Sequence, residues 1–411
     1  MVNETTIMIH HVLFLLVLIY AVGVLSGKIA KAVKLPDVAV FLISGMVLGQ
    51  GLHLINEPST SFTNQFILII GSALILFDGG RNIRLQGLAK VWVTVSLLSV
   101  PGVLITCGAV AAAVHYLLGL DWIYAFLLGA IISSTDPATL IPVFKQVKIR
   151  PKVRETVESE SAFNDATGSI LTFSILAIIM GTQKVTISSG IMNFLTTALG
   201  GIAVGLFIGF LLTYLTSHRT LGLLRDYTTI AMIVAALGAF LLGETFHVSG
   251  FMATFVAGLI WGNAPLFKLN MKEKESEMNH FSENLTLMMR MLIFILLGSQ
   301  VNIEAILHYF WPSVAVIAIF MLIARPLTVL ACALLDRSAK WERNEILFMF
   351  WVRETGVIPA ALAGMVAAAG IEHVEIIAAV TFMAVLLTIV FQASTTAFVA
   401  RKLGIVYESD R

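Results

Sequence analysis

Residues 160–165 read Glu-Ser-Ala-Phe-Asn-Asp and lie within an apolar stretch, 155–181, whose length suits a membrane span. A carboxylate in the middle of a bilayer costs several kcal/mol, so Asp165 is a candidate functional residue by its position alone. A second acid, Asp136, lies in the preceding apolar stretch and is followed by Pro137. Two buried acids on neighbouring spans predict a pathway for a cation or a proton.

The composition indicates that these acids belong to a membrane protein. Of the 411 residues, 58% are hydrophobic and 12% are charged, which is about half the charged fraction of a soluble protein. The apolar residues form blocks near the length of about 20 residues that a helix needs to cross a bilayer. The net charge is +1, and the sequence contains no basic domain. We therefore expect an all-α polytopic membrane protein in contact with the lipid bilayer and with no nucleic acid partner.

The hydropathy pattern predicts about thirteen transmembrane helices in a single unit, 1–411. The expected spans are 7–27, 37–54, 64–80, 88–117, 122–145, 155–181, 188–216, 226–243, 248–263, 282–300, 304–335, 345–369 and 374–400. Inner loops carry the excess of Lys and Arg in membrane proteins, and with an outer N-terminus only Lys184 falls in an outer loop. We expect a multi-pass protein of the cell membrane, inner or plasma, with its N-terminus outside and its C-terminus in the cytoplasm.

Four charged residues lie at one depth in this topology. Asp136, Asp165, Arg325 and Arg353 are each nine to eleven residues from the inner end of their span. At about 1.5 Å per residue this is roughly 14–17 Å, near the middle of the bilayer. Four charges on four spans can neutralise one another only if they converge inside the helix bundle.

Two spans are interrupted at corresponding places. The fifth contains Asp136-Pro137 and the twelfth contains Thr355-Gly356-Val357-Ile358-Pro359. Proline removes a helical hydrogen bond, and in lipid the freed carbonyl groups need protein, water or an ion as partners. An ordinary proline kink explains either interruption alone, whereas the pair predicts two inverted repeats with broken helices crossing at the midplane. The expected ranges are 7–181 for the first repeat, 188–216 for a linking helix and 226–400 for the second repeat.

The residues around Asp165 offer oxygen ligands for a hard cation such as Na⁺. Ser161 shares the helix face of Asp165, and Glu158 continues that face toward the cytoplasm, where it could line a funnel. Asp136 and the carbonyl groups near Thr135 complete the candidate set, and no cluster of His and Cys offers a transition-metal alternative. A carboxylate that holds either a proton or a metal cation exchanges the two by competition.

Glu160 is five residues before Asp165 and points to another face of the helix. It suits a structural salt bridge better than ion binding. Arg325 is its natural partner, because either charge would be very costly if it were buried alone.

The chain resembles the monovalent cation/proton antiporter family, in its NhaP-like Na⁺/H⁺ branch, over nearly its whole length. Residues 160–165 are similar to the E-S-x-x-N-D helix of that family. Supporting similarities are Thr135-Asp136-Pro137, Phe77-Asp78-Gly79-Gly80 and Arg325-Pro326. The order and spacing of these pieces carry the resemblance.

The resemblance implies an NhaA-like fold and a homodimer, with a dimerisation domain and a six-helix core that moves as an elevator. It implies that Asp165, Ser161, Asp136 and the backbone of Thr135 bind the cation. Asp78, near the inner end of the third span, matches a further acidic ligand of the family.

The resemblance also implies roles for residues that support this site. Asn164 would hold the unwound helices together, and Glu160 and Arg325 would form the core salt bridge. Asn-Asp in place of Asp-Asp is typical of electroneutral members that move one proton per cation. The family motif W-x-G-L-R-G is altered here, because Arg353 lies two residues early and Thr355 occupies the usual place of the arginine. The modulatory roles of Arg353 and Thr355 therefore stay open.

We expect a secondary active transporter, and not an enzyme, that exchanges Na⁺ or Li⁺ for H⁺ electroneutrally and serves pH homeostasis. No cofactor is expected besides the transported ions. K⁺/H⁺ exchange is the alternative within this class, since the types of ligand do not fix the size of the cavity. A cation channel is the alternative from another class, although no filter sequence is visible. An aspartyl protease using Asp136 and Asp165 is disfavoured by the proline and by the arginine counter-charge.

Overall fold

The computed structural model describes residues 4–33, 35–135, 144, 147–182, 187–217, 222–269 and 271–406. Within these ranges the chain is helical and contains no strand, apart from an isolated bridge between Ile149 and Val406. The principal helices are α1 (Glu4–Val33), α2 (Asp37–Met46), α3 (Phe62–Asn82), α4 (Leu85–Ser99), α5 (Pro101–Leu118), α6 (Trp122–Ile132), α8 (Pro151–Ile179), α9 (Ile187–Thr216), α10 (Thr228–Thr245), α11 (Gly250–Gly262), α12 (Glu275–Gln300), α13 (Ile303–His308), α14 (Phe310–Ile319), α15 (Arg325–Ala333), α16 (Arg343–Trp351), α17 (Val357–Ala368), α18 (Val374–Thr388) and α19 (Ser394–Lys402). The expected all-α fold is confirmed.

The helices also match the expected spans in sequence. In the described ranges, nine helical stretches are long and apolar enough to cross a membrane, and four further apolar helices are shorter. Each expected span overlaps one of these helices, while the number that cross the bilayer stays a prediction. Two of the short helices, α6 and α17, belong to the fifth and twelfth spans, where the sequence predicts interruptions.

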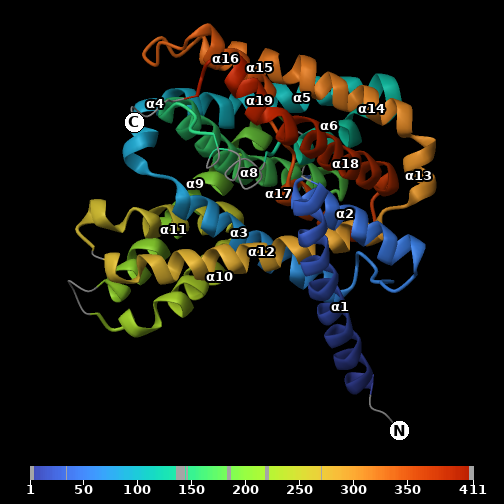
Figure 1. Ribbon diagram of the computed structural model, residues 1–411, viewed down its shortest axis with the longest axis horizontal. Coiled ribbons are helices and arrows are strands. Elements are labelled where there is room, and N and C mark those ends of the chain that lie inside the picture. The colour runs from blue at the N-terminus through green and yellow to red at the C-terminus, as the bar shows by residue number, and fades with distance from the viewer. Residues whose placement is uncertain are drawn as a thin grey trace.

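The helices form two layers (Figure 1). One layer contains α1–α3 and α9–α12, and the other contains α4–α6, α8 and α14–α19. Helices α8 and α17 lie where the layers meet, because α8 contacts α9 and α11 while α17 contacts α3 and α12. Each layer combines helices from both halves of the chain, so segments distant in sequence build the region between the layers.

Close backbone packing holds the first layer together. A Cβ on Gly258 of α11 would lie 2.1 Å from the carbonyl oxygen of Phe77 in α3, and a Cβ on Gly80 of α3 would lie 2.1 Å from that of Phe255 in α11. Small residues at such positions let two helices approach without side chains between them. The contact fixes α3, which carries Asp78, against α11.

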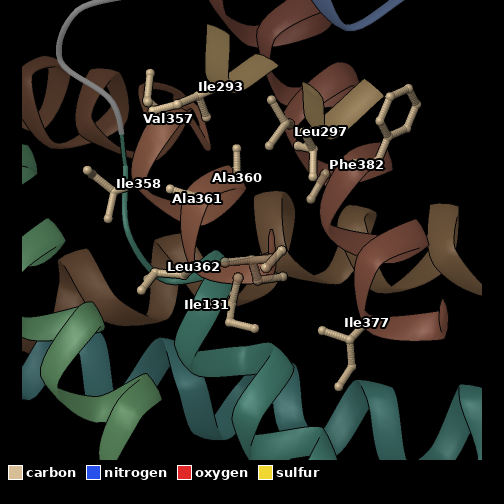
Figure 2. Close-up of a cluster of buried hydrophobic side chains, with 14 of the residues drawn as sticks. Ile131, Ile293, Leu297, Val357, Ile358, Ala360, Ala361, Leu362, Ile377 and Phe382 are labelled. Carbon is tan, nitrogen blue, oxygen red and sulfur yellow. The ribbon is translucent and has the colours of Figure 1, made fainter. Parts of the chain in front are cut away.

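An apolar cluster positions the helix that follows the second interruption (Figure 2). Val357 and Leu362 of α17 pack in one buried cluster with Ile293 and Leu297 of α12, and Ile131 near the end of α6 belongs to the same cluster. In a soluble protein, such side chains gain about 1.5–3 kcal/mol each by leaving water. In lipid the corresponding gain comes from close packing and not from leaving water. The end of α6 and the start of α17 are therefore held by the same packed core.

Candidate functional site

The first interruption is held by α8. Helix α6 ends at Ile132, and the chain is no longer helical at Ser134 and Thr135. The amide of Asn164 accepts a hydrogen bond from the backbone N–H of Thr135 (3.0 Å) through Oδ1 and donates one to Thr135 Oγ1 (2.8 Å) through Nδ2. The hydroxyl of Ser134 donates to the backbone carbonyl of Asn164 (3.3 Å). Asn164 thus supplies partners that the chain loses where the helix stops.

A third residue joins this contact and extends it toward Asp165. Ser161 Oγ lies 2.8 Å from Thr135 Oγ1, and Thr135, Ser161 and Asn164 form what we call the Asn164 cluster. Asp165 is buried, with 5% of its surface exposed, and it shares the helix face of Ser161 one turn along α8. Asp136, Pro137 and the residues up to 143 lie outside the described residues. The structure therefore brings together the hydroxyl and amide groups of the expected site beside Asp165.

The second interruption lies between α16, which ends at Trp351, and α17, which begins at Val357. The intervening segment, 352–356, is buried although it is not helical. Pro359 lies in the first turn of α17, where its missing N–H leaves no intrahelical hydrogen bond unmade. The break therefore precedes the proline, whereas the sequence placed it across Thr355–Pro359.

A buried ion pair connects α8 to the helices around the second interruption. Arg325, the first residue of α15, donates to both carboxylate oxygens of Glu160, at 2.5 and 2.9 Å. Their side chains are 1% and 3% exposed. Arg325 also donates to the carbonyl oxygens of Met349 (2.8 Å) and Val352 (3.3 Å) near the end of α16. The last carbonyl groups of a helix lack intrahelical donors and carry partial negative charge. The guanidinium of Arg325 therefore stabilises both the Glu160 carboxylate and the end of α16.

Arg353 links the two interruptions directly. Its Nη2 donates to the carbonyl oxygen of Ser133 (2.6 Å), at the end of α6. Its Nη1 lies 3.7 Å from Glu160 Oε1, and its guanidinium lies 5.4 Å from the ring centre of Phe320, a cation–π distance. The arginine whose role the sequence left open therefore shares Glu160 with Arg325 and reaches the fifth span.

Two other expected site acids have partners of their own. Asp78 of α3 accepts hydrogen bonds from Arg81 (2.9 Å) and from Ser282 of α12 (2.5 Å). Glu158 of α8 accepts one from Arg154 (2.8 Å), one turn earlier. Within the ranges that the structure describes, no hydrogen bond joins either carboxylate to the Asn164 cluster.

The sequence did not single out two buried polar residues beside the second interruption. Glu354 and Gln392 are both 0% exposed. Thr396 donates to Glu354 Oε1 (3.4 Å), and Thr388 accepts from the backbone N–H of Thr355 (3.0 Å). Gln392 could have been singled out from the sequence, because it is a polar residue inside an apolar span.

Helix ends buried inside a membrane bundle, beside paired charges and an oxygen-rich cluster, are typical of secondary transporters. The family model "Sodium/hydrogen exchanger, transmembrane" matches residues 14–402. The chain therefore belongs to the sodium/hydrogen exchanger family, whose members are transporters and not enzymes. The expected family is confirmed.

Known proteins resemble the chain along most of its length. A probable Na⁺/H⁺ antiporter of Methanocaldococcus jannaschii is 32% identical, with 93% of this chain and 95% of that protein covered. The K⁺/H⁺ antiporter NhaP of Alkalimonas amylolytica is 30% identical, with 98% of this chain and 68% of that protein covered. The structure of the sodium proton antiporter MjNhaP1 from Methanocaldococcus jannaschii at pH 8 has a TM-score of 0.82 and 29% identity, over 98% of this chain and 99% of that chain.

Proposed function

We propose that this protein exchanges Na⁺ or Li⁺ for H⁺ across the membrane, because both ions compete for Asp165. The observation that supports this most is the Asn164 cluster, which fixes the hydroxyl groups of Thr135 and Ser161 beside the helix face of buried Asp165. Hydroxyl, carbonyl and carboxylate oxygens are the ligands of hard cations. The carboxylate of Asp165 holds the metal ion when it is deprotonated and releases it when it is protonated.

We assign the cation ligands as Asp165, Ser161, Asp136 and the backbone of Thr135. Asp78 is a further acidic ligand, which joins only after it gives up its hydrogen bonds to Arg81 and Ser282. Glu158, half-buried and paired with Arg154, lines the inner funnel.

The surrounding residues have supporting roles in this proposal. Asn164 holds the interrupted fifth span, and the pair of Glu160 and Arg325 stabilises the core. Arg353 and Thr355 modulate the site from the twelfth span.

The exchange is proposed to be electroneutral, with one proton for each cation. The residue before Asp165 is the neutral Asn164, and both ends of its amide are already bonded to Thr135. An amide has no proton to give up at physiological pH. Asp165 is therefore the residue of this pair that changes charge when the two ions exchange.

We further propose a homodimer in the cell membrane that serves pH homeostasis, with its N-terminus outside and its C-terminus in the cytoplasm. The distribution of Lys and Arg supports the orientation. The two layers support the inverted repeats, 7–181 and 226–400 around the linking helix 188–216, because each layer takes helices from both repeats (Figure 1). In an elevator motion, the layer of α4–α6, α8 and α14–α19 would move against the other.

K⁺/H⁺ exchange is the second candidate. The relative from Alkalimonas amylolytica carries that name at 30% identity, and oxygen ligands alone do not determine which alkali cation fits.

Reconstitution in liposomes with a trapped pH dye tests the proposal. Addition of Na⁺ or Li⁺ to acid-loaded vesicles is expected to raise the internal pH, and clamping the membrane potential at different values should leave the rate unchanged. Asp165→Asn should abolish the signal, because an amide cannot alternate between a proton and a metal ion. Asp37→Asn is the matched control, since Asp37 is paired with Arg290 (3.2 Å) away from the Asn164 cluster.

Each contrary outcome has a separate meaning. A signal with K⁺ but not with Na⁺ would establish the second candidate. Cation current in the absence of proton movement would indicate a channel. Full exchange by Asp165→Asn would show that the competition takes place elsewhere.

A further inference from the structure

A second buried polar region lies between the interrupted segment 352–356 and the last span. Thr388, Gln392 and Thr396 follow one another at four-residue spacing and share a helix face. Thr388 Oγ1 accepts from the backbone N–H of Thr355 (3.0 Å), and Thr396 Oγ1 donates to Glu354 Oε1 (3.4 Å). Gln392 lies on this helix face between two residues that contact the interrupted segment.

Gln392 and Thr355 have buried side-chain groups without a hydrogen-bond partner in the part of the chain that the structure describes. Gln392 is 0% exposed, and neither Oε1 nor Nε2 has a hydrogen-bond partner among the described residues. Thr355 is also 0% exposed, and its Oγ1 has no partner in the same ranges. Buried polar groups are normally bonded, because leaving them unsatisfied is costly. Unsatisfied groups on two facing elements therefore point to a ligand.

The backbone of the last span widens at the same place. Residues Ile389–Ala393, which include Gln392, are π-helical. π-helical turns are rare and occur frequently at functional sites. The last span thus departs from regular α-helix opposite the interruption of the twelfth span.

We propose that Gln392 and Thr355 hold buried water in a polar site between the interrupted segment 352–356 and the last span. The chemistry of Gln392 selects water, because its amide presents both an acceptor and donors, and a water molecule can bond to either. A metal cation would bind Oε1 and leave the N–H donors unsatisfied. Water here solvates a segment that has lost its helical hydrogen bonds inside the membrane.

X-ray diffraction from crystals of the full chain, at a resolution that shows ordered water, tests the proposal. We expect density within about 3.2 Å of the Gln392 amide and of Thr355 Oγ1. Crystals soaked in Tl⁺, a heavy substitute for alkali cations, should show no anomalous peak at Gln392. A cavity without density would overturn the proposal, and a Tl⁺ peak there would replace water by a cation. Neither measurement involves transport, so the outcome is independent of the proposed exchange activity.

Thermal unfolding of two variants gives a second test. Gln392→Met keeps the length of the side chain but removes its polar atoms, so Thr355 Oγ1 loses the water that bonds it and the melting temperature should fall. Phe391→Leu is the control, because Phe391 lies in the same π-helical turn but is 56% exposed, and its substitution should leave the melting temperature unchanged. A higher melting temperature for Gln392→Met would show that no water is bound to the Gln392 amide, and it would refute the proposal.

Discussion

Replacing Glu160 by glutamine tests the role of the buried ion pair most directly. The substitution preserves the size of the side chain but removes the negative charge that faces two guanidinium groups. Arg325 makes two hydrogen bonds to this carboxylate, at 2.5 and 2.9 Å, and Arg353 lies 3.7 Å from it. Glu160→Gln should therefore destabilise the protein while leaving the ligands of the cation site in place.

The expected magnitude follows from the burial of the three charges. Removing one partner of a buried ion pair typically costs about 3–5 kcal/mol, because the remaining charge is left uncompensated. Here Arg325 is 1% exposed and Arg353 is 2% exposed, so the loss should lie in the upper part of that range. The hydrogen bonds from Arg325 to Met349 and Val352 remain available and should prevent complete unfolding.

Denaturant titration of the purified protein in detergent measures this loss. Glu158→Gln is the matched control, because Glu158 lies on the same helix and pairs with Arg154 at a site where the side chains are 21% and 43% exposed. Loss of this exposed ion pair should lower the free energy of unfolding by about 0.5 kcal/mol or less. If Glu160→Gln cost no more than this control and changed only the apparent affinity for Na⁺, Glu160 would be part of the ion site and its structural role would be refuted.

Asn164→Ala removes both side-chain bonds to Thr135. It should lower the free energy of unfolding by roughly 1–3 kcal/mol and reduce the rate of Na⁺ exchange in liposomes. An unchanged rate would mean that Thr135 is held in place by other contacts. Gly258→Ala should lower the unfolding temperature, with a loss of about 1–3 kcal/mol, because its Cβ would lie 2.1 Å from the carbonyl oxygen of Phe77. Gly238→Ala, where a Cβ meets nothing within 4 Å, should be neutral or stabilising, and equal effects of the two would contradict the close packing of α3 and α11. Burial raises the pKa of Asp336 in the loop after α15, but hydrogen bonds from Ser338, Thr94 and Ala339 outweigh it and hold the pKa below its usual value. The stabilisation from this lowered pKa is present above about pH 4 and is lost as the pH falls through the folded-state value, so Asp336→Asn should flatten the acid side of a plot of unfolding temperature against pH.

Much of the fold could be predicted because the membrane leaves few alternatives. Apolar blocks of this length form helices, since every backbone polar group must be satisfied within the segment. The pairing of Glu160 with Arg325 could also be predicted from the sequence. Helix geometry places Glu160 away from Asp165, and charge neutrality requires a partner at the same depth. The ion pair is present in the structure.

The sequence could not locate contacts in which the backbone is the acceptor. Arg353 donates to the carbonyl oxygen of Ser133, and a carbonyl group has no signature in the side-chain sequence. The position of that carbonyl depends on where α6 ends, and Asn164 on α8 contributes to the hydrogen bonds there. A contact between three separate spans cannot be read from any one of them.

Asp78 illustrates a different limit. The family resemblance matched it to a cation ligand from four consecutive residues, but its hydrogen bonds to Ser282 and Thr286 come from α12. A short motif describes its own helix and says nothing about a neighbour that lies about two hundred residues later. Asp78 can therefore bind a cation only after these bonds open.

The hydrogen bond from Arg353 to Ser133 has a mechanical consequence. The backbone of Arg353 belongs to the gap between α16 and α17, while its guanidinium holds the end of α6. A displacement of either segment therefore has to carry the other with it for as long as this hydrogen bond holds.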